Sequence, residues 1–298
     1  MGVITMGTRA LVLILSLLLV GGLFQACAKD TIERLPDVVT QGIPENEKVR
    51  NTIVSEGFTI DIHITYAEIV SYSGKAASVI LPESATGVPI KLIGEGAFQN
   101  NKTLKKVTLP SATLTIGRYA FEGCSALTEV IFNDGLETIS DYAFRNSGLT
   151  TFSLPDSLAS IGSYSFYNTK IEVLDIPESV SRLKKFAFYG CKNLKSISFC
   201  PRLYEIGENV FYNCTALTEI VLPKTVTKIG NYAFSSCSSL VKVVIPAETE
   251  TIGVGVFMNC PELTIYGPAG SAAEKHAGHN NYTFQAVNYD SFVAEEGA

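Results

Sequence analysis

Apolar residues recur in a fixed register along most of this chain. An Ile or Leu stands at eight positions spaced 22 or 23 residues apart, and a Phe follows each of them after five residues. A period in the twenties predicts a solenoid, because each unit is too small to bury its apolar face alone and must stack on its neighbours. The eight repeat Phe are Phe98, Phe121, Phe144, Phe166, Phe188, Phe211, Phe234 and Phe257.

The segment that follows each repeat Phe predicts a short strand. In LKKVTLP, Val107 and Leu109 lie two residues apart and share one face, so Lys106 and Thr108 point to the other. Proline follows such a segment in seven places and ends the strand, because it has no N–H to donate to a ladder. We therefore expect one short strand per coil, with like side chains in columns.

Small residues at fixed positions predict two corners per coil. Gly follows the repeat Ile or Leu in six of eight units, with Ser140 and Lys184 as exceptions. Asn or Gly lies two residues after the repeat Phe in seven of eight units. Both residue types accept left-handed backbone geometry at low cost.

Flanking segments differ from the repeats. FTIDIHI and YAEIVSYSG alternate apolar and polar residues, which predicts a β-hairpin that caps the solenoid. We assign residues 58–92 to this cap, 93–266 to eight repeats, 267–287 to a C-terminal cap and 288–298 to a tail. Residues 27–57 mix charges and prolines without a period, which is typical of a tether.

The N-terminus predicts export. Arg9 precedes the apolar run ALVLILSLLLV, so residues 1–26 have the pattern of a signal peptide. Ala26 directly precedes Cys27, which resembles a bacterial lipobox and predicts a lipid on Cys27. Conventional cleavage near Ala28 and an uncleaved anchor are the alternatives. All three place the remaining chain outside the cytoplasm, anchored on the cell surface or outer membrane, or else secreted or periplasmic.

Composition narrows the classes of function. With 46% hydrophobic and 17% charged residues the chain can build a sizeable core, and a net charge of −6 without a basic stripe argues against nucleic-acid binding. No phosphate loop, nucleophile elbow or carboxylate pair is recognisable, so we expect no enzyme and no cofactor. His276 and His279 beside Glu274 could share a helix face, but ordinary surface histidines explain them better than a metal site.

Cysteines follow the same register. Five of the seven stand three residues after a repeat Phe, and Cys200 takes an apolar site before Pro201. Buried thiols acting as small apolar groups explain this placement, and disulfides between adjacent coils remain an alternative. The absence of C-x-x-C spacing argues against zinc. The five are Cys124, Cys191, Cys214, Cys237 and Cys260.

The recurring pattern IG-x-x-AF-x-x-C-x-x-L-x-x-V-x-LP resembles the BspA-like class of leucine-rich repeats over residues 58–287. The resemblance implies a leucine-rich-repeat solenoid, a right-handed curved superhelix, with a short helix at SAAEKHAG capping the last coil. Proteins of this class are mostly found on surfaces of bacteria and some protists. The resemblance therefore implies adhesion or binding of host proteins and no enzymatic activity.

Two sets of residues are candidates for binding an extracellular host or matrix protein. The outward strand positions form one extended surface, and tyrosines directly after the repeat Phe form another. A merely solvated sheet and partial burial over the Phe column are the respective alternatives. A structural role in the envelope is the alternative function. The strand candidates are Lys106, Glu129, Ile131, Thr151, Val173, Asp175, Ser196, Glu219, Val221, Lys242 and Val244, and the tyrosines are Tyr167, Tyr189 and Tyr212.

Overall fold

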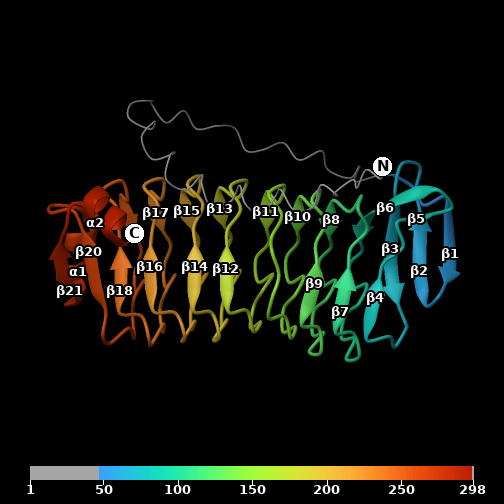
Figure 1. The fold of residues 1–298 in the computed structure, drawn as a ribbon, viewed down its shortest axis with the longest axis horizontal. Helices are drawn as coiled ribbons and strands as arrows, with labels where there is room; N and C mark the ends of the chain where they lie inside the picture. The colour runs from blue at the N-terminus through green and yellow to red at the C-terminus, as the bar shows by residue number, and fades with distance from the viewer. Residues whose placement is uncertain (1–46, 297–298) are drawn as a thin grey trace, which may run out of the picture. The chain divides into compact units, whose positions relative to one another are not determined.

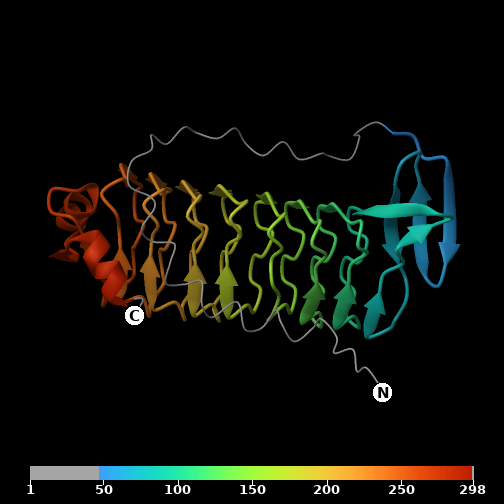
Figure 2. The ribbon, with the colours of Figure 1, turned by 45° about the horizontal axis from the view of Figure 1, so that its top comes forward.

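Coils of nearly equal length stack along one axis in this protein (Figure 1). The computed structural model describes residues 47–296, so the signal peptide and Cys27 lie outside the described residues. It is a β-solenoid of about ten turns with about 23 residues per coil, which confirms the predicted fold class. The strands lie on two separate sides of the stack (Figure 2).

One side, which we call the long-strand face, carries the predicted strands. They pair in parallel so that like positions lie opposite one another, for example Glu219 against Lys242. In most of them the middle residue is buried and its two neighbours point outward. The strands are β4 (Ser78–Ile80), β7 (Lys106–Thr108), β9 (Glu129–Ile131), β12 (Val173–Asp175), β14 (Ser196–Ser198), β16 (Glu219–Val221), β18 (Lys242–Val244), β20 (Thr264–Gly267) and β21 (Thr283–Ala286).

The other side, the short-strand face, carries a second strand in each coil, so the prediction of one strand per coil was incomplete. These strands contain the repeat Ile or Leu and the residue before it, and two residues are too few for alternation to reveal a strand. They are β8 (Thr115–Ile116), β10 (Thr138–Ile139), β11 (Ser160–Ile161), β13 (Arg182–Leu183), β15 (Glu205–Ile206), β17 (Lys228–Ile229) and β19 (Thr251–Ile252).

The repeat Phe side chains form one buried column. Successive rings from Phe98 to Phe257 lie 4.9–5.9 Å apart between centroids, with interplanar angles of 1–13°. In the same turns the N–H of Phe121 donates to the carbonyl of Ala143 in the next coil, at 2.8 Å. The predicted alignment of core side chains along the axis is therefore confirmed.

Backbone geometry confirms one predicted corner and corrects the other. The residue two after each repeat Phe is left-handed, as at Asn100 with φ 61°. The Gly after the repeat Ile does not have a left-handed backbone. A Cβ on Gly117 would lie 2.7 Å from the carbonyl oxygen of Ile93, so this Gly permits close packing of coils. The second left-handed corner lies two residues before Phe, where Tyr142 has φ 62°.

Both strand faces are interrupted where the two shorter units lie, and the long-strand face is interrupted again between β14 and β16. No ladder joins β11 to β13, or the Thr151 segment to β12, among the described residues. Across this junction the turn hydrogen bond from Phe166 N to Ala187 O, at 2.8 Å, and the Phe column continue. The coils there are held together mainly through the turns.

The N-terminal cap is larger than predicted. The hairpin of β2 (Phe58–Ile62) and β3 (Ala67–Tyr72) is confirmed, and β3 joins the solenoid through the parallel strand β6 (Val88–Ile93), which β5 (Ser84–Ala85) also pairs. However, β1 (Asn51–Ser55), assigned to the tether, pairs with β2. As an edge strand with mostly exposed side chains, it lacks the alternation that would have revealed it.

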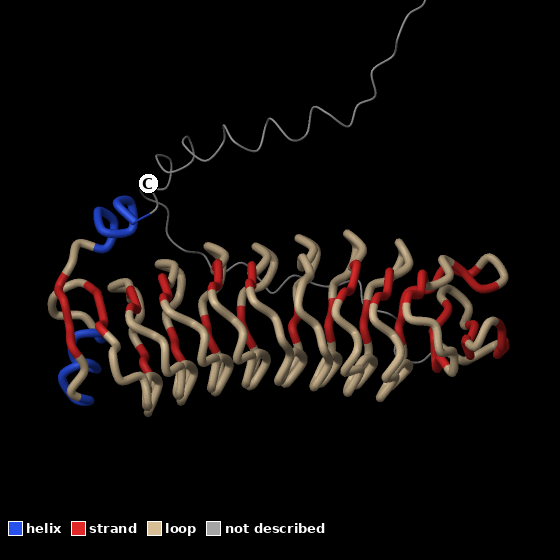
Figure 3. The backbone as a smooth tube through the Cα atoms, turned by 60° about the horizontal axis from the view of Figure 1, so that its bottom comes forward, coloured by secondary structure: helices blue, strands red, loops and turns tan. Residues whose placement is uncertain are grey.

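The C-terminal cap contains two helices, both at the end of the solenoid (Figure 3). The predicted helix is present as α1 (Ala272–Asn280), with Ser271 as N-cap and left-handed Asn281 as C-cap. The segment assigned to a tail forms a second helix, α2 (Tyr289–Glu296).

All six cysteines in the described part of the chain are buried free thiols, so the disulfide alternative is not realised there. The Sγ of Cys124 donates to the carbonyl of Phe98 in the preceding coil at 3.0 Å, and four other repeat cysteines repeat this contact. Burial raises the pKa of Cys124 to about 11 and that of Cys191 to about 12. The thiols therefore serve as uncharged donors within the core.

The Phe column should dominate stability. We expect Phe188→Ala, which empties a fully buried site in a middle coil, to lower the free energy of unfolding by about 3–5 kcal/mol. Urea denaturation followed by circular dichroism measures this. Val254→Ala, at a side chain that is 69% exposed, is the control and should change stability by less than about 0.5 kcal/mol. Equal effects of the two substitutions would contradict the packing described here.

Candidate binding surface

The long-strand face presents most of the predicted strand residues to solvent. Val173 is 56% exposed, Ile131 42% and Val221 36%, although all three are apolar. Exposed side chains on neighbouring strands are mainly hydroxyls and carboxylates, namely Thr151, Asp175, Ser196, Ser198 and Glu219. The result is a sheet surface that mixes apolar and polar contacts, with parallel strands setting the spacing.

Paired charges mark the two ends of this surface. The Nζ of Lys106 lies 2.7 Å from Glu129 Oε1 at one end, and Lys242 Nζ lies 3.9 Å from Glu219 Oε2 at the other. Between them the lane of Thr151, Val173 and Ser196 carries no charge, whereas the neighbouring lane carries the exposed carboxylate of Asp175. A partner would therefore meet a centre with one carboxylate, flanked by ion pairs.

One of the strand residues predicted to bind a partner is not exposed to solvent. Val244 is fully buried, and the side chain of Lys242 is only 13% exposed, compared with 40% for Lys106 at the equivalent position. The helix α2 accounts for the difference, since the ring of Phe292 lies 5.0 Å from Lys242 Nζ and stacks on Tyr266. Sequence periodicity could not reveal this, because α2 lies outside the repeats.

The tyrosine candidates lie in the turns and not on the sheet, so the predicted residues divide between two surfaces. The rings of Tyr167 and Tyr189 stack with centroids 5.0 Å apart, and those of Tyr189 and Tyr212 with centroids 4.7 Å apart. All three are half-buried. Because the ring faces contact one another, ring edges and hydroxyls remain for a ligand. Partial burial, the alternative interpretation of these three tyrosines, therefore explains much of why tyrosine stands at these positions.

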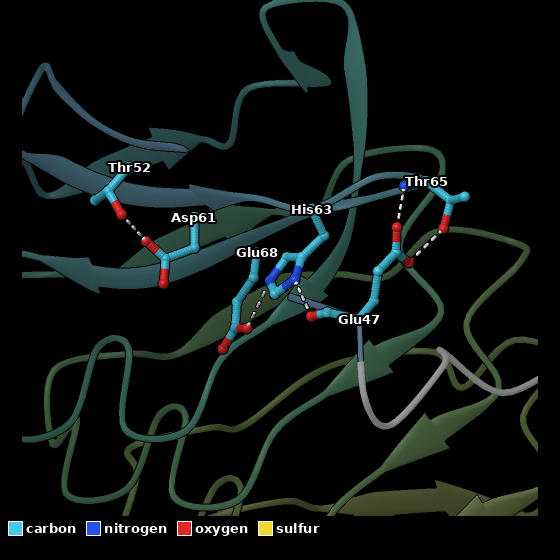
Figure 4. Close-up of polar contacts among 6 residues, drawn as sticks. All are labelled: Glu47, Thr52, Asp61, His63, Thr65 and Glu68. Carbon is cyan, nitrogen blue, oxygen red and sulfur yellow. Dashed lines mark hydrogen bonds and ion pairs between the residues drawn. The ribbon is translucent and has the colours of Figure 1, made fainter. Parts of the chain in front are cut away.

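A polar cluster around His63 in the N-terminal cap has no signal in the sequence pattern (Figure 4). The buried His63 ring stacks on Tyr66, its Nδ1–H donates to the carbonyl of Glu47 at 2.8 Å, and its Nε2 lies 3.7 Å from Glu68 Oε2. The Glu47 carboxylate accepts from the N–H and hydroxyl of Thr65. No sequence period links these residues, because the hairpin brings them together.

This cluster fastens the start of the described chain to the cap. Because Nδ1 donates to a carbonyl, the orientation of the His63 ring is fixed and its Nε2 faces the Glu68 carboxyl. Burial raises the pKa of Glu68, while His63 opposes that shift. The arrangement favours a structural, protonation-dependent contact.

The remaining candidates for metal chemistry find no support. Within the described residues no group of three or more His, Cys, Asp or Glu could hold a metal ion. His276 packs edge-on against Phe257 at the end of the Phe column, and burial, followed by the charge of His279, lowers its pKa. His276 thus closes the core at this end.

Among the helices of residues 47–296, none has the length and apolar character needed to span a membrane.

Comparison with known families agrees with this geometry. The model of the BspA type leucine rich repeat region matches residues 91–169 and 159–273, with six copies. This is more than half of the chain, and the chain belongs to this family. The matching model describes a repeat region, and no enzyme family is indicated. A search of curated proteins gives no match.

Solved leucine-rich repeat proteins align with this chain over most of its length. A T. pallidum leucine rich repeat protein is 23% identical, covering 80% of this chain and 100% of its own, with a TM-score of 0.38. A leucine rich cell surface protein from Faecalibacterium prausnitzii is 20% identical, with coverage of 77% and 98% and a TM-score of 0.34. A Eubacterium ventriosum leucine-rich repeat protein is 23% identical, with coverage of 74% and 73% and a TM-score of 0.47.

Burial of the Glu68 carboxyl predicts a pH-dependent contribution to stability. A raised pKa means that the folded cap retains a proton that the unfolded chain releases, so this stabilisation is present at acidic pH and lost as the pH rises through the raised pKa. Glu68→Gln cannot ionise. We therefore expect the variant to gain stability relative to the parent protein between pH 4 and about pH 7, measured by urea denaturation.

Ser71→Ala, at an exposed position on the same strand, is the control for this experiment. Its stability relative to the parent should be the same at both pH values. A Glu68→Gln difference that also stays constant with pH would show that the carboxyl does not titrate with folding.

Proposed function

We propose that this protein is a non-enzymatic cell-surface binding module that recognises host or matrix proteins through the long-strand face. The observation that carries the proposal is the exposure of Ile131, Val173 and Val221 on the long-strand face, where they lie on three separate parallel ladders on the same side of the stack. Exposed apolar residues on a rigid sheet cost solvation free energy that a protein partner would recover on binding. Membership of the BspA type family supports the proposal.

Surface display would follow from attachment at the N-terminus. The apolar leader and the Ala26–Cys27 junction support cleavage before Cys27 and lipid attachment to its thiol. The membrane partner is then the lipid chain, and the solenoid is held outside the cytoplasm by residues that follow Cys27.

Mass spectrometry of the mature protein tests the anchor. We expect an N-terminal peptide that begins at Cys27 and carries the mass of a diacylglyceryl group. Cys27→Ala should remove that mass and release the protein from the membrane fraction. An unmodified N-terminus at Lys29, or an intact leader, would show conventional cleavage or an uncleaved anchor instead.

The binding face is tested by substitution of two of its exposed residues. Val173→Lys and Glu219→Lys should weaken binding to immobilised extracellular-matrix proteins by at least about 10-fold when combined, because each places a cation against the desolvated partner. Surface plasmon resonance provides the measurement. Thr227→Lys, exposed beside β17 on the short-strand face, is the matched control and should bind as the parent does.

Two results would contradict this assignment. Unchanged strong binding after the paired substitution would place the binding surface elsewhere, with the stacked tyrosines as the next surface to test. Absence of binding to any matrix protein by the parent would favour the alternative of a structural envelope protein.

A further inference from the structure

The C-terminal helix α2 covers part of the long-strand face. Along the outward lane of that face Asp175, Ser198 and Val221 are exposed, whereas Val244, the next residue in the lane, is fully buried. Val244 pairs with Tyr266, whose ring stacks on Phe292 of α2. One stretch of the surface proposed for binding is therefore already occupied by a segment of the same chain.

The contacts of α2 define what this surface accepts. The hydroxyl of Tyr289 donates to the carbonyl of Leu222, directly after β16, at 2.5 Å. Phe292 lies against Tyr266 and the ammonium of Lys242, with centroid distances of 5.0 Å to each. Asp290 pairs with Lys224 at 2.6 Å. Two aromatic side chains three residues apart thus face the sheet, with a carboxylate beside them.

The helix α2 is held by its side-chain contacts with the sheet and not by its own length. It has eight residues, and an isolated helix of that length is not stable in water, so its helical form depends on the sheet beneath it. Its ion pair with Lys224 is largely exposed and contributes little. The helix lies near the end of the described chain, so its displacement disturbs no later element of residues 47–296.

We infer that α2 is an intramolecular stand-in for a partner helix, and that the long-strand face binds an amphipathic helix with aromatic residues three apart and a neighbouring acidic residue. This inference rests on the proposed function and specifies its partner. The exposed Val221 continues the covered lane beyond α2, and Ser198 and Asp175 follow it, so a longer helix could follow the same lane. Amphipathic helices bind hydrophobic partner surfaces through such periodically spaced anchors.

Covalent attachment gives α2 an advantage over any partner. A tethered segment acts at an effective concentration of about millimolar, so a partner must displace it to reach Val244 and Lys242. Removing α2 should therefore expose the end of the surface and strengthen binding of a helix that uses it.

A peptide of residues 288–298, NYDSFVAEEGA, is the probe. It is titrated by fluorescence anisotropy against the full chain and against a chain ending at Val287, with folding of the latter verified by circular dichroism. We expect saturable binding to the shortened chain that is at least about 10-fold tighter than to the full chain, because the tethered competitor is gone. A peptide carrying Phe292→Ala is the control and should bind at least about 10-fold more weakly, because it lacks the anchor ring.

Lysine acetylation followed by mass spectrometry provides a second measurement that does not depend on the deletion. In the full chain, Phe292→Ala should accelerate acetylation of Lys242 several-fold, with Lys106 as the internal reference. In the shortened chain the added peptide should slow it again. No saturable peptide binding together with unchanged Lys242 reactivity would overturn the inference. If matrix binding nevertheless depended on Val173, the proposed function would stand and only the partner helix would be rejected.

Discussion

Stacking of each coil on the next is the interaction on which this structure depends. No coil has enough residues to enclose its own Phe, so each ring is desolvated by the rings above and below it. The centroid spacing of 4.9–5.9 Å in the Phe column matches the spacing that adjacent parallel strands impose. Backbone pairing and core packing therefore require the same repeat of the chain, and neither can change length without the other.

Because backbone pairing and core packing share one repeat, the Phe column continues where the strand ladders are interrupted. At the shorter units the strand ladders lapse, while turn hydrogen bonds and stacked rings continue through Phe144, Phe166 and Phe188. The thiol contacts reinforce the same turns, since each repeat cysteine donates to a Phe carbonyl in the preceding coil. The turns are thus the continuous part of the solenoid, and the two strand faces are less uniform.

The first and last coils of such a stack each lack a neighbour on one side. Both caps cover these ends with aromatic and polar contacts. At the first end Phe58 and Tyr72 cover Phe98, and β1 adds an outer strand. At the last end His276 and Tyr282 meet Phe257 edge-on. The helix α2 goes further than closure requires, because it lies on the outward surface. That placement links the end of the core to the surface proposed for binding.

Periodicity by itself determined the solenoid, the Phe column, the outward strand lanes and the buried thiols, because these depend on neighbours that carry the same residue in the same register.

The sequence pattern did not reveal features without a counterpart in other coils. The two-residue strands are too short to alternate, β1 is an edge strand, and the His63–Glu68 contact joins residues of the cap. Gly117 was assigned a left-handed corner, whereas the close approach of Ile93 is what requires it. Val244 fits the outward pattern as well as Val221 does, yet it is fully buried near the end of the stack, beside Tyr266, on which Phe292 of α2 stacks. Local repetition therefore decides which residues stack, and the tertiary structure decides which of the outward residues remain exposed, because exposure depends on segments that come from outside the repeat.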